Sequence, residues 1–233
     1  MKKASVRQFA FHNKPLAERI RQRKQPLQDR SRATIEAVLE ATLQVLVREG
    51  YGRLTTTRVA ERAGVSVGTL YQYFPDKRSL VLALKQRYFD LMLGAIAKAM
   101  RENVDAPPQT LIRAALAALI AVKRENIALS VALREPLAEP ESNGILDELS
   151  ARFVELVCAM LAPAYPRRRD LPQRAAFLVA MIDGVLGHAV AAAPEWLHET
   201  WFLDDLNKVA TDYLRTMETT TRPAGSVMRR DDG

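Results

Sequence analysis

Apolar residues recur at helical spacing along most of this 233-residue chain, and no segment alternates apolar and polar positions as a strand would. The first regular segment starts near Asp29 or Ser31, either of which can cap a helix, and stops at Gly50 and Gly52. Its apolar positions share one face of that helix and include Ile35, Val38, Leu39 and Leu46.

Seven further segments share this character and are separated by turns that contain proline or glycine. They cover about 55–63, 66–74, 76–101, 109–134 (as a helix pair), 145–161, 173–192 and 197–217. The pattern predicts an all-α protein of about nine helices, and no internal repeat is visible.

The composition agrees with this fold class. Apolar residues make up 48% of the chain but aromatic residues only 6%, and alanine and leucine dominate the apolar set, which favours helix over strand. The single cysteine, Cys158, excludes an intramolecular disulfide and fits a reducing cytoplasm. No apolar run reaches the roughly 18 residues that a membrane span needs. We therefore expect a cytoplasmic protein with no membrane contact.

The positive charge of the chain is concentrated at its N-terminus. Residues 1–32 hold ten Lys or Arg and two acidic residues, whereas 33–78 carry a net charge of +1 and 79–233 a net charge of −2. Basic N-terminal arms commonly contact nucleic acid by neutralising phosphates or by entering a minor groove. A solvated tail is the alternative, and the sequence does not decide between them.

The segment 55–74 predicts two short helices joined by a tight turn. Thr55 or Thr56 can cap the first helix, Gly64 can form the turn, and Ser66 can cap the second helix. This is the pattern of a helix-turn-helix, although short patterns of this kind also occur in ordinary helix packing.

The second helix of this motif has two different sides. Leu70 and Phe74 are four residues apart and point into a small core. A short helix with a polar, aromatic and glycine-containing outer side fits the major groove of DNA. On such a helix a glycine allows DNA to approach the backbone closely, a side-chain amide can pair with a base edge, and hydroxyls can reach phosphates or bases. That outer side carries Gly68, Thr69, Tyr71 and Gln72.

These residues belong to a dense pattern that resembles the signature of the TetR family of transcriptional regulators. The matching positions are Gly50-Tyr51, Leu54-Thr55-Thr56, Val59-Ala60, Ala63-Gly64-Val65-Ser66, Gly68-Thr69-Leu70-Tyr71, Tyr73-Phe74 and Lys77. The resemblance covers about residues 30–80. It implies a three-helix DNA-binding domain followed by a larger helical domain for effector binding and dimerisation.

The resemblance also implies roles for single residues. Phosphate contacts are expected from Thr56, Thr69, Tyr71 and Lys77. Ser66, Val67, Gly68 and Gln72 would lie over the bases. Thr57 stands where several relatives carry an Arg that reads a base, and Thr55 and Tyr73 complete the predicted DNA-binding set.

The family pattern further implies a homodimeric repressor that a small molecule releases from a pseudo-palindromic operator in double-stranded DNA. Asp183, Gly184 and Gly187 are the predicted dimer residues. The two glycines would let helices approach closely, with packing within one subunit as the alternative, and Asp183 would make an interface or cap hydrogen bond. The predicted pocket residues, which ordinary core packing would equally explain, are Phe89, Met92, Met160, Phe177 and Met181. Because these stretches contain few charges, an apolar or amphipathic effector is favoured.

The predicted organisation is an arm at 1–28, a DNA-binding domain at 29–78, an effector and dimerisation domain at 79–218, and a flexible tail at 219–233. We expect no enzyme, catalytic residue, cofactor or metal, because the sequence holds three His residues, no Cys cluster, no phosphate loop and no nucleophile elbow. A sequence-tolerant DNA-organising protein without an effector is the alternative function, since the basic arm would suit it.

Overall fold

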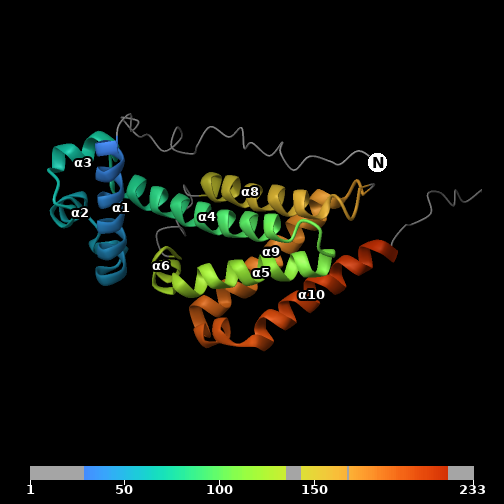
Figure 1. Cartoon of the computed structure of the whole chain (residues 1–233). Coiled ribbons are helices and arrows are strands. Elements are labelled where there is room, and N and C mark those ends of the chain that lie inside the picture. Colours follow the sequence, from blue (N-terminus) through green and yellow to red (C-terminus); the bar gives the residue numbers. More distant parts are fainter. Residues whose placement is uncertain (1–28, 135–142, 167, 220–233) are drawn as a thin grey trace, which may run out of the picture. The chain divides into compact units, whose positions relative to one another are not determined.

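The computed structural model describes residues 29–134, 143–166 and 168–219 (Figure 1). The predicted arm and nearly all of the predicted tail lie outside these described residues. The described part contains nine α-helices, two 3-10 helices and no strand, so the all-α prediction is confirmed. In chain order these are α1 (Asp29–Glu49), η3 (Tyr51–Arg53), α2 (Thr56–Ala63), α3 (Val67–Tyr73), α4 (Lys77–Glu102), α5 (Pro108–Glu125), α6 (Ile127–Ala132), α8 (Asn143–Leu161), α9 (Leu171–Ala192), η5 (Pro194–His198) and α10 (Thr200–Thr219).

Helix α1 begins at Asp29, so both predicted capping residues, Asp29 and Ser31, lie inside the helix. The prediction that one of them is its N-cap is therefore wrong. The predicted stop is confirmed, because Gly50 has a φ of +78°, a left-handed value that a glycine adopts without steric cost. Thr42 is fully buried, and its hydroxyl donates to the Val38 carbonyl oxygen at 2.7 Å. A polar side chain is thereby accommodated in the apolar face of α1.

Packing divides the chain into two compact units. The first comprises Met1–Leu91 and Ala128–Leu149, and the second comprises Met92–Ile127 and Ser150–Gly233. Helices α4 and α8 therefore contribute to both units. The predicted boundary at 78–79 lies inside the first unit, and it remains a prediction about function.

The first unit contains a three-helix head, which we define as α1, η3, α2 and α3, together with the start of α4. Its core is formed by fully buried apolar side chains from the α-helices and the segments between them, among them Val38, Leu46, Leu54, Leu70, Phe74 and Leu80.

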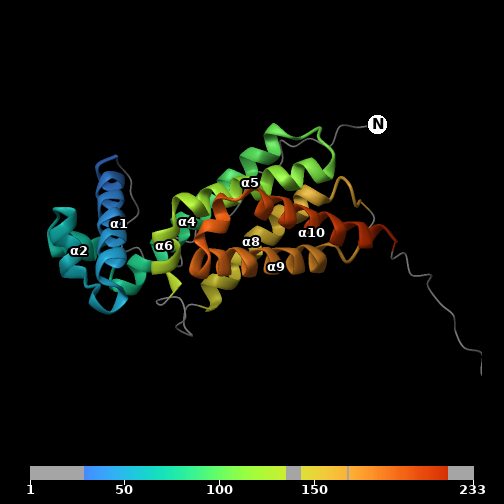
Figure 2. The same ribbon diagram turned by 90° about the horizontal axis from the view of Figure 1, so that it is seen from below.

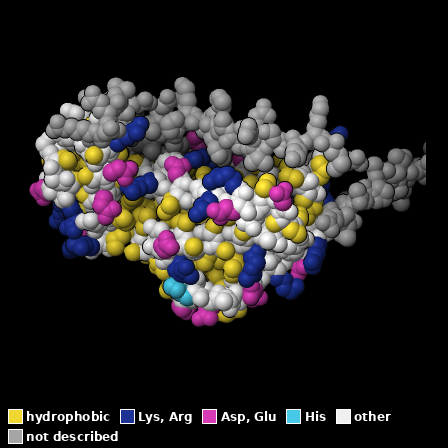
Figure 3. All heavy atoms as spheres, viewed as in Figure 1, with side chains coloured by type: hydrophobic (Ala, Val, Ile, Leu, Met, Phe, Trp, Pro, Cys, Tyr) yellow, Lys and Arg dark blue, Asp and Glu magenta, His cyan; other side chains and the backbone are white. Residues whose placement is uncertain are grey.

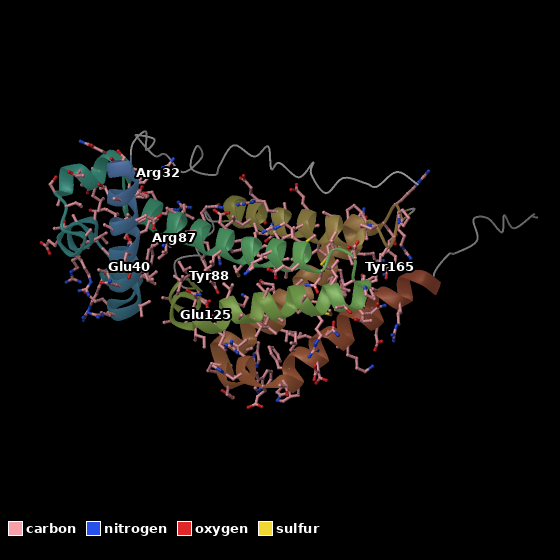
Figure 4. The ribbon with its side chains drawn as sticks, in the orientation of Figure 1. Arg32, Glu40, Arg87, Tyr88, Glu125 and Tyr165 are labelled. Carbon is pink, nitrogen blue, oxygen red and sulfur yellow. The ribbon has the colours of Figure 1, made fainter. Side chains whose placement is uncertain are left out.

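Helix α4 starts on a reciprocal cap formed by Asp76 and Ser79. The Ser79 amide donates to the Asp76 carboxylate at 2.7 Å, and the Asp76 amide donates to the Ser79 hydroxyl at 3.3 Å. Two contacts then tie α4 to neighbouring elements of the first unit. Arg87 pairs with Glu36 of α1 at 2.5 Å, and the hydroxyls of Tyr88 and Ser130 of α6 lie 2.6 Å apart. Figure 4 labels the Arg87 and Tyr88 side chains on α4. These contacts join the linking helix directly to the head and to α6.

The second unit is built around α5, α9 and α10. Helix α10 packs on α5, and η5 contacts α5, α9 and α10. Figure 2 shows α9 and α10 side by side, and the rings of Phe177 and Tyr213 stack between them with centroids 5.0 Å apart.

Helix α9 corrects one expectation from the sequence. By length and composition, Leu171–Ala192 is apolar enough to cross a membrane, although no such run was expected. Asp183 and His188 interrupt the continuous apolar run, but the mean hydropathy of its 18-residue window is still 1.8. One helix of this kind is weak evidence for a span, because core helices of soluble proteins pass the same test. Only 33% of its apolar window is buried inside the chain, so much of its surface is open to other contacts.

Candidate nucleic-acid interface

The turn between α2 and α3 has the geometry that its sequence predicts. Thr55 caps α2, and its hydroxyl accepts a hydrogen bond from the Arg58 amide at 3.3 Å. Gly64 ends α2 in the left-handed region with a φ of +68°, and the Val65 amide reaches back to the Ala60 carbonyl oxygen at 3.0 Å. The chain therefore turns within the three residues 64–66, and α3 packs against α2.

Helix α3 presents two sides of opposite character. Leu70 is completely buried and Phe74, which follows the helix, is as well. On the outer side Gly68 and Gln72 are exposed, and Tyr71 is 39% exposed. The predicted division of this helix into a core side and an outer side is thus present.

Gly68 is not needed for packing within the head. A Cβ atom placed there would meet only the Ser66 hydroxyl oxygen at 3.8 Å, an ordinary van der Waals distance, and its φ is not in the left-handed region. Packing within the head therefore does not require glycine here, and the absence of a side chain leaves the backbone of α3 open on its outer side.

Hydroxyl groups connect the two helices at this surface. The Thr56 and Tyr71 hydroxyls lie 3.0 Å apart, which links the first turn of α2 to the middle of α3. The Ser66 hydroxyl accepts from the Thr69 amide at 3.0 Å and lies 2.8 Å from the Thr69 hydroxyl. A hydroxyl can donate one hydrogen bond and accept others, so a hydroxyl that takes part in these bonds can still hydrogen-bond to a phosphate. Thr57 and Gln72 are exposed and Val67 is half-buried on the same helices.

Two predicted DNA-binding residues have roles inside the protein. Tyr73 is only 6% exposed, because it lies three residues after Leu70 and shares its inward side. The Lys77 ammonium lies 4.1 Å from the centroid of the Tyr51 ring and donates to the Tyr51 carbonyl oxygen at 3.5 Å. A cation over an aromatic ring is attracted by its negative face, so Lys77 fixes η3 against the start of α4.

Several arginines of the head were not singled out by the sequence reasoning. Arg48, Arg53, Arg58 and Arg62 are exposed, and Figure 3 shows Lys and Arg side chains gathered over the C-terminal end of α1 and α2. The Arg58 guanidinium binds Glu49 at 2.6 Å and the Arg53 carbonyl oxygen at 3.1 Å. Arg58 therefore orients the segment that leads into the capped end of α2. These arginines belong to three different elements, so no local sequence motif predicts that they gather on one surface.

The predicted pocket residues fall in both units. Phe89 belongs to the first unit and packs against the cluster of Leu82 and Leu149. Met92 and Met160 are buried in the second unit, at 3% and 8% exposure. Met181 is half-buried on α9, but Phe177 is 55% exposed. Phe177 therefore lies on the surface of the second unit rather than in its interior.

The predicted dimer residues lie together on α9. Gly184 is exposed and Gly187 half-buried, and a Cβ atom added at either would meet nothing within 4 Å. Asp183 is 77% exposed, and its carboxylate lies 3.6 Å from the ammonium of Lys123 on α5. The described residues contain no group of three or more His, Cys, Asp or Glu side chains that could hold a metal ion.

Comparison with known proteins agrees with this geometry over both parts of the chain. Residues 38–84 match the profile of bacterial regulatory proteins of the tetR family, and residues 107–214 match the tetracyclin repressor-like C-terminal domain. The chain belongs to the TetR family. Its members are transcription regulators rather than enzymes, and this TetR-family chain is accordingly a DNA-binding transcriptional regulator.

Individual relatives are of several kinds. The HTH-type transcriptional regulator BetI of Burkholderia thailandensis is 28% identical over 166 residues, which cover 67% of this chain and 82% of BetI. The nucleoid occlusion factor SlmA of Actinobacillus pleuropneumoniae is 38% identical over 93 residues, covering 39% of this chain and 45% of SlmA.

Among solved structures, the TetR-family repressor FadR of Thermus thermophilus in complex with lauroyl-CoA has a similar fold. It aligns with a TM-score of 0.58 and 19% identity, covering 85% of this chain and all of FadR. At this identity the likeness concerns the fold alone.

Proposed function

We propose that the protein is a homodimeric repressor that binds a pseudo-palindromic operator and leaves it when a small-molecule effector binds. The observation that carries this proposal is the outer side of α3, where Gly68 has no packing role and Gln72 is exposed beside a row of hydroxyls. Such a helix can enter a major groove with its side chains on the base edges.

The roles proposed for single residues follow from this placement. Ser66, Val67, Gly68 and Gln72 lie over the bases. Thr56, Thr69 and Tyr71 bind phosphates with their hydroxyls. The ammonium of Lys77 has three donors, so it can bind a phosphate while it keeps its contact with Tyr51. Tyr73 supports α3 from inside rather than touching DNA, because its ring is buried.

A dimer is proposed because one head spans only a few base pairs. Two heads related by a twofold axis can occupy successive major grooves about 34–36 Å apart. The surface that supports a dimer is the outer side of α9 and α10, where Phe177, Trp201 and Val209 are 55%, 44% and 48% exposed. The empty surroundings of Gly184 and Gly187 would allow the helices of a second copy to approach closely. We call this the α9–α10 face.

An apolar or amphipathic effector remains the favoured class. The interior of the second unit is lined largely by leucine, isoleucine, methionine and alanine, as at Leu119, Met160 and Ile182. FadR of similar fold was solved with lauroyl-CoA, an amphipathic molecule, which supports the proposal that this architecture can accept one. For release, the effector must bind one arrangement of the two heads more tightly than the other.

The alternative is a DNA-organising protein with no effector, and the similarity to the nucleoid occlusion factor SlmA is the observation that favours it. The two functions differ in how strongly the protein prefers one DNA sequence over random DNA. A regulator binds its site at least about 10³ times more tightly than random DNA. An organiser binds both alike, with an affinity that falls steeply as salt rises.

The test is a titration of purified full-length protein with selected and random duplexes of equal length at several salt concentrations. Compounds are then screened for release of the specific complex. A ratio above about 10³, together with one releasing compound, is expected. Equal affinities would overturn the regulator proposal, and a specific complex that no compound releases would overturn the effector part only.

A further inference from the structure

Lys123 occupies a position where the sequence pattern calls for an apolar side chain. It is 8% exposed and is the only charged residue in the described part of the chain that is buried. Ile112, Leu116, Leu119 and Lys123 follow one another at helical spacing along a single face of α5, and the first three are buried apolar residues. The stem of Lys123 therefore continues the apolar stripe of α5 within the second unit.

The ammonium of Lys123 is incompletely partnered. Its ion pair is with the Asp183 carboxylate of α9 at 3.6 Å, a distance too long for a hydrogen bond. An ammonium has three donors, and it donates no hydrogen bond to any of the residues that the structure describes. Asp183 is itself 77% exposed, so water weakens its attraction for the lysine. The stem of Lys123 is buried, but its Nζ is not among the fully buried side-chain atoms of the described residues that lack a hydrogen-bond partner, so water reaches the ammonium and an anion could replace that water.

Two features hold the ammonium ready for an anion. Lys123 lies in the last turn of α5, where the helix dipole favours a positive charge. Its long apolar stem packs with the stripe, while its head reaches the α9 side at Asp183.

We propose that Lys123 recognises an anionic head group on the effector, a carboxylate or a phosphate, joined to an apolar body. This inference rests on the proposed effector function. The anion binds the free donors of Lys123 and displaces Asp183, whose exposed carboxylate turns into solvent. Asp183 directly precedes Gly184 of the α9–α10 face, so the displacement changes the charge beside the proposed dimer contact.

Three probes of equal chain length test the charge requirement: dodecanoate, dodecyl phosphate and dodecanol, each below its micelle-forming concentration. Their binding to purified full-length protein is followed by the fluorescence of Trp196 and Trp201 or by equilibrium dialysis. We expect at least one anion to bind about ten times more tightly than dodecanol. The tighter of the two anions identifies the head group as carboxylate or phosphate.

Substitutions then assign the preference to Lys123. Lys123→Met should abolish the preference for the anion while leaving the melting temperature unchanged or higher, because methionine fits the apolar stripe. Lys208→Met is the matched control, since it removes an exposed lysine that also pairs with an aspartate, and it should keep the preference. Asp183→Asn should strengthen anion binding several-fold and leave dodecanol binding unchanged.

Equal binding of anions and alcohol, or an anion preference that survives Lys123→Met, would overturn the inference. So would the failure of all three probes to bind. None of these results would decide the proposed function, which depends on specific operator binding and its release by other compounds.

Discussion

Two exposed helix sides of this protein differ sharply in chemistry. The outer side of α3 carries a glycine, an amide and hydroxyls, whereas the outer side of α9 carries an exposed phenylalanine among alanines and glycines. Both sides contain a glycine that internal packing does not require, Gly68 on α3 and Gly184 on α9. We infer from this comparison that each surface meets a close partner. We propose nucleic acid for the polar side of α3 and a second copy of the chain for the apolar side of α9.

The largest expected effect comes from placing a charge on the α9–α10 face. Phe177→Asp should raise the dissociation constant of the dimer by about 100-fold or more, because a carboxylate would be buried twice in a symmetric interface. Sedimentation across a concentration series measures this constant, and operator affinity should fall with it. Val104→Asp is the control, because Val104 is equally exposed at 56% but lies in the turn after α4. If both variants remain dimers, the face has been assigned wrongly.

The next effect concerns Gly68. Gly68→Ala should lower operator affinity about tenfold or more by holding the DNA away from the backbone of α3. The same change should raise the stability of the head by about 0.5–1 kcal/mol, because alanine is the better helix former. Fluorescence anisotropy and thermal unfolding give the two values. Gly64→Ala is the contrasting variant, since its left-handed φ of +68° makes it destabilising. Unchanged DNA affinity in Gly68→Ala would remove the close-approach argument.

A third prediction separates base reading from phosphate binding on α3. Gln72→Ala should relax the preference at one base position by about 1–3 kcal/mol if the contact is bidentate. Affinities for a set of operators with single-base changes would reveal that position.

Tyr71→Phe serves as its counterpart. Loss of the hydroxyl removes the 3.0 Å contact with Thr56 and one proposed phosphate contact, so binding to every sequence should weaken alike, by about 1 kcal/mol. If both variants affect specific and random DNA equally, the assignment of Gln72 to the bases is wrong.

The smallest effect is a pH dependence at the start of α9. The Arg168 guanidinium donates to Asp170 at 2.9 and 3.0 Å and Arg174 adds a bond at 3.2 Å, which holds the pKa of Asp170 well below its ordinary range. A lowered pKa in the folded state stabilises the protein above the unfolded value of about 3.9, and this contribution is lost as the pH falls below it. Asp170→Asn should therefore lower the melting temperature slightly at pH 7, by an amount that shrinks between pH 5 and pH 3. Asp205→Asn, an exposed carboxylate outside this cluster, is the control.

The head was the most predictable region because local rules decide its structure. The caps at Thr55 and Ser66 and the left-handed turn at Gly64 each depend on one residue and its immediate neighbours. Tyr73 was harder, because a tyrosine on a seven-residue helix fits either side until the packing around Leu70 is known. The internal role of Lys77 was not predicted for a similar reason, because its contact with Tyr51 joins residues that are distant in the chain.

The second unit was less predictable because its helices are apolar on more than one side. On α9 the spacing of apolar residues does not distinguish a core side from a contact side, so Phe177 was taken for interior and is 55% exposed. The burial of Lys123 was not predicted for the same reason, because it follows from the packing of α5 and not from the neighbouring residues in the sequence. Where every side of a helix is apolar, only the three-dimensional arrangement identifies the surface that remains for a partner.

Sequence-specific binding by a dimer is tested most directly by selecting bound sequences from a random DNA pool with the full-length protein at physiological salt. A sequence-specific dimer would recover a pseudo-palindrome whose half-sites lie about one helical turn or a multiple of it apart, as two heads on a twofold axis require. Recovery of no common motif, with binding that disappears as salt rises, would contradict it and identify a DNA-organising protein instead.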